Sequence, residues 1–209
     1  MKKSDVFDHL SCNLGVNSDE PNIELASSLC ASRNEGAVET LIGGLQSSNP
    51  AIAGDCIKVL YELGRRSPDM IADYAPVFIK LLHSKSNRMV WGGMTALALI
   101  TRLNPSDVFA GRDTVIKAYE NGSVITRDES ISVFAELSRA DEKYERIMFP
   151  LILRHLASCR PKEIPQHAQR ALAAVNEANA SAFKSVIEKR IDLLSSPQRK
   201  RVEKILRSV

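Results

Sequence analysis

The side chains best suited to metal chemistry are few and scattered. The histidines are His9, His83, His155 and His167, and the cysteines are Cys12, Cys30, Cys56 and Cys159, with no CxxC pair among them. His155 and Cys159 lie four residues apart on a possible helix and offer two ligands at most, whereas a zinc site needs three or four. The sequence therefore predicts no metal and no cofactor.

Catalysis by a nucleophile finds no support in the spacing of the residues. No Ser-His-Asp or Cys-His arrangement can be assigned from the sequence. The glycine pairs Gly43-Gly44 and Gly92-Gly93 match no phosphate-binding pattern of the GxGxxG or GxxxxGK[ST] kind. We therefore expect a protein that is not an enzyme and has no small-molecule substrate. The widely separated cysteines favour a reduced, cytoplasmic setting over a disulfide scaffold.

The charge balance excludes some classes of protein. The 209 residues carry 28 lysines and arginines against 25 aspartates and glutamates, a formal net charge of +3. This value argues against a strongly basic nucleic-acid coat protein. Residues 1–5 include basic side chains but no apolar run follows them. We expect neither a signal peptide nor a membrane-spanning helix.

A repeat of 37 residues organises most of the chain. Residues 41–45 align without a gap with residues 78–82, 115–119 and 152–156. The second halves of the units share apolar columns, namely Ile57, Met94 and Ile131, then Leu60, Leu97 and Phe134, then Leu63, Ile100 and Leu137. Apolar residues recur at spacings of three and four, so each unit is predicted to form two helices.

Prolines and small residues refine this prediction. Pro76 and Pro150 are 74 residues apart, twice the repeat, and are expected to bend the first helix of their units. The two glycine pairs are interpreted as sites where helices pack closely. A small-residue column, made of Cys56, Gly93, Ser130 and Ala168, points the same way. In the fourth unit a slip of one residue brings Leu172 and Val175 into the apolar columns.

The predicted fold is an all-α right-handed α-α superhelix, a solenoid of about five to six helical hairpins with ten to twelve helices and no strand. Residues 1–35 are expected to form degenerate N-terminal capping helices, over 4–14 and 20–33. Residues 36–178 form four regular repeats, and residues 179–209 form a basic C-terminal capping pair. We expect these parts to make one continuous domain.

The pattern resembles the HEAT repeat family, part of the armadillo-like helical superfamily, over roughly residues 36–195. The paired helices, Pro76 and Pro150 carry the resemblance, together with second helices such as residues 51–64, which end in Leu-x-x-Leu. The repeat is shorter than the ~40–47 residues usual for the family. The resemblance implies a solenoid whose second helices line a concave face, and it implies little about function.

The outward stripe of the second helices, found by rotating 100° per residue, carries the predicted partner-binding residues. They are Lys58, Arg65, Arg88, Trp91, Thr95, Leu99, Arg102, Arg139 and Arg170. The stripes of the four units carry net charges of 0, +2, −2 and 0. A phosphate backbone would require an excess of cations. We therefore predict a non-catalytic scaffold that binds a protein or peptide partner on its concave face.

Two details of this stripe have alternative interpretations. Trp91, the only tryptophan, is either a binding hot spot beside Arg88 and Arg102 or a side chain packed between second helices. Arg65, Arg102 and Arg139 recur at the 37-residue step. These arginines either bind an acidic segment of a partner or complement the dipoles of the helices that they end.

The C-terminal segment supports the alternative function. Residues 181–209 contain eight lysines or arginines and three acidic residues. A nucleic-acid-binding HEAT-like module using the basic helix over residues 197–209 is therefore the second hypothesis. The competing interpretation is a capping helix with a core of Val202, Ile205 and Leu206. A DNA-glycosylase-like enzyme is disfavoured, because the concave face is neutral and the stripe offers no carboxylate beside Trp91 on its own helix.

Overall fold

The computed structural model describes residues 6–209, so the expectations about residues 1–5 lie outside the described range. Residues 6–209 form twelve α-helices and five short 3-10 helices and contain no strand, which confirms the all-α prediction. Within this range, no helix combines the length and the apolar character needed to cross a membrane. All four cysteines have free thiols.

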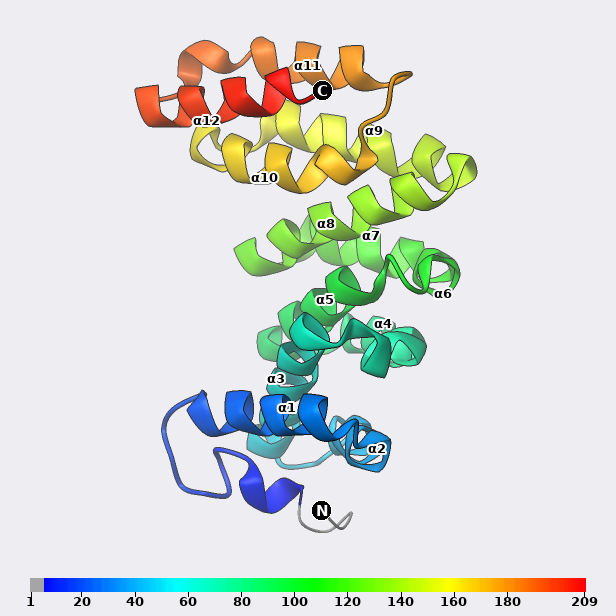
Figure 1. Ribbon diagram of the computed structural model, residues 1–209, viewed down its shortest axis with the longest axis vertical. Coiled ribbons are helices and arrows are strands. Elements are labelled where there is room, and N and C mark those ends of the chain that lie inside the picture. Colours follow the sequence, from blue (N-terminus) through cyan, green and yellow to red (C-terminus); the bar gives the residue numbers. More distant parts are fainter. Residues whose placement is uncertain (1–5) are drawn as a thin grey trace. The chain divides into compact units, whose positions relative to one another are not determined.

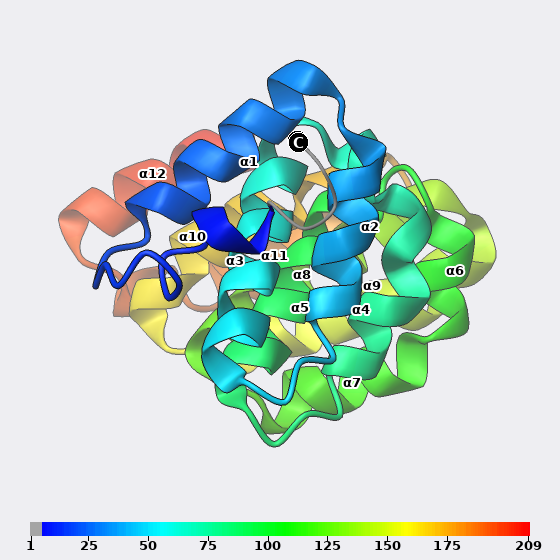
Figure 2. The same ribbon diagram turned by 90° about the horizontal axis from the view of Figure 1, so that it is seen from below.

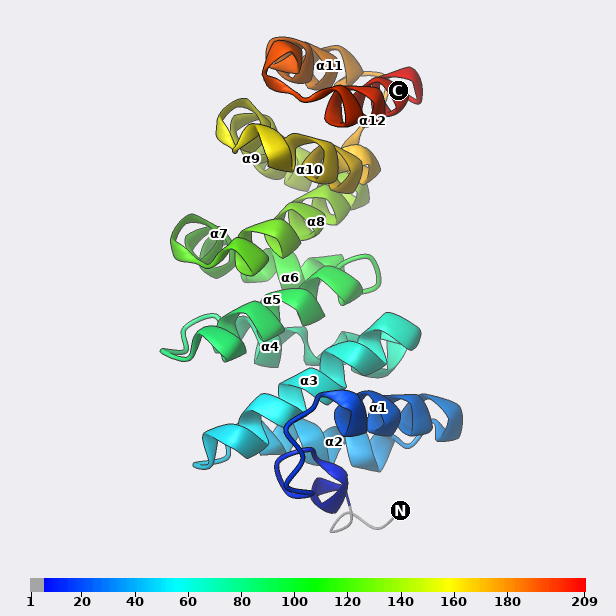
Figure 3. The same cartoon turned by 90° about the vertical axis from the view of Figure 1, so that its left-hand side faces the viewer.

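The chain divides into two compact units, Met1–Glu129 and Ser130–Val209, and the boundary falls within helix α8 (Val124–Ala140). The elements of the first unit are η2 (Phe7–His9), α1 (Glu20–Ser32), α2 (Glu35–Gly44), α3 (Pro50–Arg66), η3 (Pro68–Tyr74), α4 (Ala75–Leu81), α5 (Asn87–Ile100), α6 (Pro105–Ala110) and α7 (Arg112–Asn121) (Figure 1). Helix α3 packs against α1, α2 and α5 (Figure 3). Figure 2 views this unit from its N-terminal end, with α1 and α2 in front.

The second unit contains the remaining helices. They are the second part of α8, then α9 (Glu142–Ser158), η4 (Pro161–Glu163), α10 (Ile164–Ala171), η5 (Leu172–Ala174), α11 (Ala180–Glu188), η6 (Ile191–Leu193) and α12 (Ser196–Arg207). Helix α9 packs against α11, and α10 packs against α12. The two hairpins α9–α10 and α11–α12 are therefore stacked so that the first helix of one contacts the first helix of the other, and the second helix contacts the second.

Short polar and proline signals start the helices. The Asn49 side chain accepts a hydrogen bond of 3.0 Å from the backbone N–H of Ala51, and Pro50 occupies the first turn of α3. Asn104 caps α6 in the same way and precedes Pro105. An asparagine cap satisfies a backbone donor that has no partner inside the helix, and proline lacks that donor altogether.

The apolar columns of the repeat form the core. Leu41, Phe78, Val115 and Ile152 occupy one column, and each has 0% of its surface exposed. The three second-helix columns are also fully buried from Ile57 to Leu137. This agreement follows from geometry, because apolar residues spaced three and four apart lie on one face of a helix and that face must be covered.

Three expectations about local structure were wrong. In the expected N-terminal helix over residues 4–14, the described part is only a 3-10 turn, Phe7–His9, followed by turns. Pro76 does not lie inside a long helix but in the first turn of α4, after the 3-10 segment η3, whereas Pro150 is inside α9. Leu172 and Val175 are only half-buried, because α10 ends at Ala171 and the chain continues as η5.

The glycine pairs differ in what surrounds them. A Cβ placed at Gly44 would lie 2.5 Å from Cys56 Sγ, and one at Gly92 would lie 2.7 Å from Ile57 Cγ1. At Gly93 a Cβ would lie 3.0 Å from the Phe78 carbonyl oxygen. These three glycines allow helices to approach closely, as predicted. Gly43 does not, since its Cβ would meet nothing within 4 Å.

Gly43→Ala and Gly92→Ala should therefore change stability in opposite directions. Gly43→Ala should raise the free energy of unfolding by about 0.5–1 kcal/mol, because alanine loses less backbone entropy in a helix. Gly92→Ala should lower it by about 1–3 kcal/mol through overpacking against Ile57. Urea unfolding followed by circular dichroism measures both. Equal effects of the two substitutions would contradict the close approach at Gly92.

Candidate functional site

The predicted binding stripe begins on α3, and most of that helix is covered. The twelve consecutive residues Ala53–Gly64 are all buried. Helices α1, α2 and α5 surround α3, and the N-terminal segment reaches it too, since the Cys12 backbone N–H donates to Asp55 Oδ2 at 2.8 Å. The helical rotation correctly placed Lys58 away from the apolar columns. It did not anticipate the segments that cover this side, so Lys58 is not an exposed cation as the binding prediction required.

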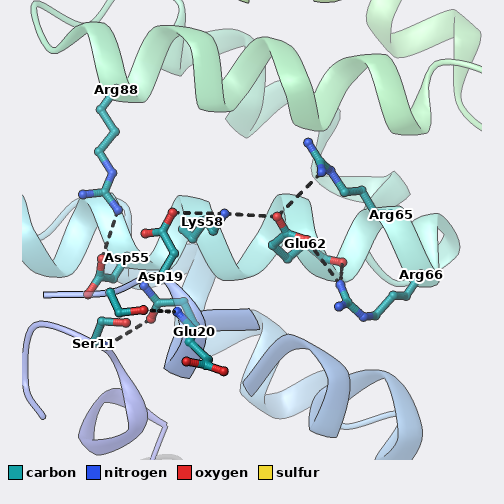
Figure 4. Close-up of polar contacts among 11 residues, drawn as sticks. Ser11, Asp19, Glu20, Asp55, Lys58, Glu62, Arg65, Arg66 and Arg88 are labelled. Atoms are coloured by element: carbon teal, nitrogen blue, oxygen red, sulfur yellow. Dashed lines mark hydrogen bonds and ion pairs between the residues drawn. The ribbon is translucent and has the colours of Figure 1, made fainter. Parts of the chain in front are cut away.

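A line of ion pairs runs along this covered side of α3 (Figure 4). Arg88 on α5 donates a hydrogen bond from its Nη2 to Asp55 Oδ1 at 3.0 Å and forms an ion pair with it. The Lys58 ammonium lies 3.2 Å from Asp19, just before α1, and 3.1 Å from Glu62 one turn along α3. Charges in such a poorly hydrated place must be paired, because an unpaired buried charge carries a large desolvation penalty.

Glu62 is the most shared carboxylate of this line. Besides its ion pair with Lys58, the Glu62 carboxylate forms ion pairs with Arg66, whose Nη1 lies 3.3 Å from Oε2, and with Arg65, whose Nη1 lies 3.8 Å from Oε1. Its side chain is only 10% exposed, whereas that of Arg65 is 54% exposed. One negative charge therefore faces three cations (Figure 4), and about half of the Arg65 side chain remains exposed to water.

Gly54 makes the Arg88 contact possible. A Cβ at this position would lie 3.0 Å from Arg88 Cζ and Nε, so the guanidinium lies directly across the glycine. The neighbouring Asp55 is then within reach of Arg88 Nη2. The predicted cation Arg88 is therefore paired with Asp55 although its side chain is 42% exposed, and this pairing reduces its capacity to attract a partner.

An aromatic pair joins α3 to α5. The ring centres of Tyr61 and Trp91 are 5.7 Å apart with the planes tilted by 53°, an arrangement favoured by aromatic quadrupoles. Lys58 Nζ and Arg65 Cζ lie 5.1 Å and 5.5 Å from the centre of the Tyr61 ring. Burial raises the pKa of the Tyr61 phenol, and hydrogen bonding to Lys58 opposes this rise. Tyr61 is therefore a neutral ring that receives cations on its face.

Both interpretations of Trp91 hold in part. It packs on Tyr61, yet it remains half-exposed. Thr95 is buried, with 4% exposure, and its hydroxyl donates to the Trp91 carbonyl at 2.8 Å. Thr95 therefore cannot serve as the exposed contact that was predicted, because serine and threonine in helices commonly turn back to the preceding turn.

Leu99 and Arg102 lie further along the same side of α5. A Cβ at Gly64 would lie 3.2 Å from Leu99 Cδ1, so Leu99 packs beside the end of α3 and stays half-buried. Arg102 follows α5, is exposed, and makes no salt bridge with any residue from 6 to 209. We call the residues Arg65, Trp91, Leu99 and Arg102 the α3–α5 surface, in which Trp91 packs on the buried ring of Tyr61.

The other two predicted residues belong to the second unit. Arg139, in the last turn of α8, is exposed and pairs with Glu136 at 3.1 Å. Arg170 is half-buried and donates to Ser132 Oγ at 2.7 Å. Arg65 and Arg139 both stand in the last turn of a helix, where a cation complements the helix dipole.

Tyr61 is the residue that sequence reasoning missed. It was assigned neither to the core columns nor to the stripe, although Lys58, Tyr61 and Arg65 follow the three-and-four spacing of helix neighbours. That spacing was a usable signal for a cation–aromatic cluster. The Asp19 contact with Lys58 had no such signal, because Asp19 precedes it by 39 residues in a different hairpin.

Glu62→Ala and Asp19→Ala form a matched pair of variants, since both remove a carboxylate from the same ammonium. Glu62→Ala should lower the free energy of unfolding by about 3 kcal/mol, because it leaves the buried Lys58 charge poorly compensated. Asp19→Ala should lower it by less than about 1 kcal/mol, because that side chain is 58% exposed. Chemical denaturation measures both. A larger loss for Asp19→Ala would contradict this description.

Comparisons with known proteins bear on the fold alone. No protein-family model and no curated protein matches the chain. An engineered protein solved by a structural genomics consortium superposes with a TM-score of 0.68 at 18% identity, covering 99% of this chain and 96% of the other. A designed armadillo repeat protein in complex with the peptide (KR)4 gives a TM-score of 0.65 at 12% identity, with 88% and 85% covered.

A natural protein shows the same likeness over part of its length. The karyopherin Kap121p, solved bound to the SUMO protease Ulp1p, gives a TM-score of 0.64 at 15% identity. The alignment covers 96% of this chain and 22% of the karyopherin, so the chain spans about a fifth of that protein. Together with the helical hairpins described above, these likenesses show that the chain has a HEAT/armadillo-like helical repeat fold.

Proposed function

We propose that this protein is a non-catalytic helical repeat protein that binds an acidic segment of a protein or peptide partner on the α3–α5 surface. The proposal rests on one observation: Trp91 and Leu99 stay partly exposed on α5, and the exposed Arg102 follows the end of that helix. Tryptophan and arginine are the residues that most often dominate binding energy, and they do so where apolar contact and charge lie together.

The charges along α3 favour an acidic partner. The line on α3 contains four cations, Lys58, Arg65, Arg66 and Arg88, against three carboxylates, Asp19, Asp55 and Glu62. One positive charge is therefore left over, and Arg102 adds a second. Two exposed cations of this set, Arg65 and Arg102, belong to the α3–α5 surface. Complementary charge at the rim of an apolar contact directs a partner and sets its orientation.

The similar proteins are compatible with a binding role. The designed armadillo repeat protein was solved with a peptide, and the karyopherin with a protein. The α3–α5 surface itself carries an indole, an alkyl chain and two guanidinium groups. None of these is an activated nucleophile, and no base lies among them. Binding is therefore the activity that this group of side chains supports best.

Trp91 supplies a direct test, because it is the only tryptophan in the chain. Its fluorescence should change when a ligand covers the surface. The probe is a twelve-residue peptide of glutamates with one leucine and one phenylalanine, and the control is the same peptide with lysines in place of glutamates. We expect saturable change with the acidic peptide only. Saturation by the basic peptide alone would overturn the proposal.

Arg102→Glu should weaken binding of the acidic peptide at least tenfold, since it reverses an exposed charge that has no salt-bridge partner among residues 6–209. Its melting temperature should stay close to that of the unchanged protein, because exposed surface substitutions alter stability little. Arg201→Glu, an exposed arginine on α12, is the matched control and should leave the affinity unchanged. Unchanged affinity in Arg102→Glu would exclude this surface as the binding site.

Trp91→Ala separates packing from binding. Loss of the contact with Tyr61 should lower the free energy of unfolding by about 2–4 kcal/mol. Loss of the exposed part of the indole should weaken peptide binding by about 2 kcal/mol. Calorimetric titration at a temperature where the variant is folded measures the second effect. A folded variant with full affinity would restrict Trp91 to a structural role.

The basic helix α12 supports a second candidate function, nucleic-acid binding. Val202 and Ile205 are buried with 0% and 3% exposure, so the helix does cap the core, with Leu206 half-buried. Lys200, Arg201, Lys204 and Arg207 are nevertheless exposed and form no salt bridge within residues 6–209, whereas Arg199 pairs with Asp192. The double variant Lys200→Glu/Lys204→Glu should abolish any salt-dependent binding of single-stranded RNA. Binding that persists in this variant would exclude α12.

A further inference from the structure

The second unit contains a buried group of metal-binding side chains that plays no part in the α3–α5 surface. His155 lies in the last turn of α9, Cys159 caps that helix, and His167 lies on α10. Exposure is 6% for His155, 9% for Cys159 and 1% for His167. Sequence spacing gave two ligands here, His155 and Cys159. The fold adds the third, because η4 reverses the chain between α9 and α10.

The three side chains converge closely. His155 Nε2 and His167 Nδ1 are 2.7 Å apart, and their ring centres are 4.7 Å apart with a tilt of 59°. One ligand atom from each of the three residues lies within 4.8 Å of the others. Around a tetrahedral zinc ion, ligand atoms stand about 3.4–3.6 Å from one another. The imidazoles would need to separate by less than about 1 Å, and the thiol would need to move inward by a comparable distance.

The chemistry of the group selects a particular kind of ion. Two imidazole nitrogens and one thiolate sulfur suit zinc and similar transition ions, whereas calcium and magnesium require oxygen ligands. The i, i+4 spacing places His155 and Cys159 on one face of α9, towards α10. Three protein ligands leave a fourth position for water or another group.

One contact of Cys159, made by Arg190, suits a thiolate ligand. Arg190 Nη1 lies 3.7 Å from Cys159 Sγ and donates to the Leu156 carbonyl oxygen at 2.7 Å. A donor that is anchored to the backbone and directed at the sulfur is the kind of outer contact that orients a metal-bound thiolate. The guanidinium charge opposes a cation but stabilises the negative sulfur that such a cation requires.

We propose that His155, Cys159 and His167 form a binding site for zinc or a closely similar transition ion that links α9 to α10. A bound ion would replace the single hydrogen bond between the two imidazoles with three ligand bonds that join the hairpin. Because these ligands belong to the folded hairpin, binding free energy adds to the stability of the folded unit. The site does not depend on the proposed peptide-binding function.

The test uses the full chain, purified without a histidine tag and freed of metal by a chelator. One equivalent of zinc should bind, and an excess of 100-fold over its Kd should raise the melting temperature by roughly 5–10 °C. Cobalt should give both d–d bands and a near-ultraviolet sulfur-to-cobalt charge-transfer band. Absence of the temperature shift and of the charge-transfer band would overturn the proposal.

Cys159→Ser and His167→Gln should abolish or strongly reduce both signals. Cys56→Ser is the matched control, because Cys56 is a buried cysteine of the first unit whose pKa is raised to about 12 by burial. It should retain the full charge-transfer band. A band that survives in Cys159→Ser would place the metal elsewhere and contradict the assignment.

A second measurement needs no substitution and so does not depend on the folding of a variant. Zinc should slow alkylation of Cys159 at least tenfold, as followed by peptide mass spectrometry. Cys12 and Cys30 are partly exposed and serve as internal controls, so their alkylation should not change. Equal alkylation of Cys159 with and without zinc would contradict the site.

Discussion

The burial of α3 is the constraint on which the first unit depends. Helices α1, α2 and α5 pack on it, and residues 53–64 are buried along three turns. A helix with this environment must compensate every charge it carries. Asp55, Lys58 and Glu62 do so through partners from α5, from the segment before α1 and from α3 itself. The ion pairs are thus a consequence of packing, and they tie three segments together.

The same constraint decides where a partner can bind. Cations that are paired with carboxylates attract little from outside, so the buried Lys58 and the partly exposed Arg88 contribute mainly to structure. The two exposed cations of the α3–α5 surface lie near helix ends, Arg65 in the last turn of α3 and Arg102 just after α5. Backbone carbonyls at a helix C-terminus also favour a cation. Trp91 and Leu99 supply apolar area between them. The α3–α5 surface is what remains accessible once the demands of the core are met.

The second unit uses polar burial differently. In the first unit, buried polar groups form charged pairs between helices. In the second, His155 and His167 are buried as a pair of imidazoles with a thiol beside them. Removing these polar groups from water costs free energy, and their apolar contacts contribute little to offset that cost. Coordination of a metal ion would account for it, and the ion would join α9 to α10 in the way that Lys58 joins α1 to α3.

The sequence by itself determined most of the helices and the regular core columns, because the three-and-four periodicity is a property of neighbours within one helix. Leu41, Ile57 and Phe78 could be placed in the core on that ground alone. Only the tertiary structure decided that Lys58 and Thr95 are buried and that His167 meets His155 and Cys159. These outcomes depend on which distant segment covers each helix face, and helical periodicity carries no information about segments far apart in the chain.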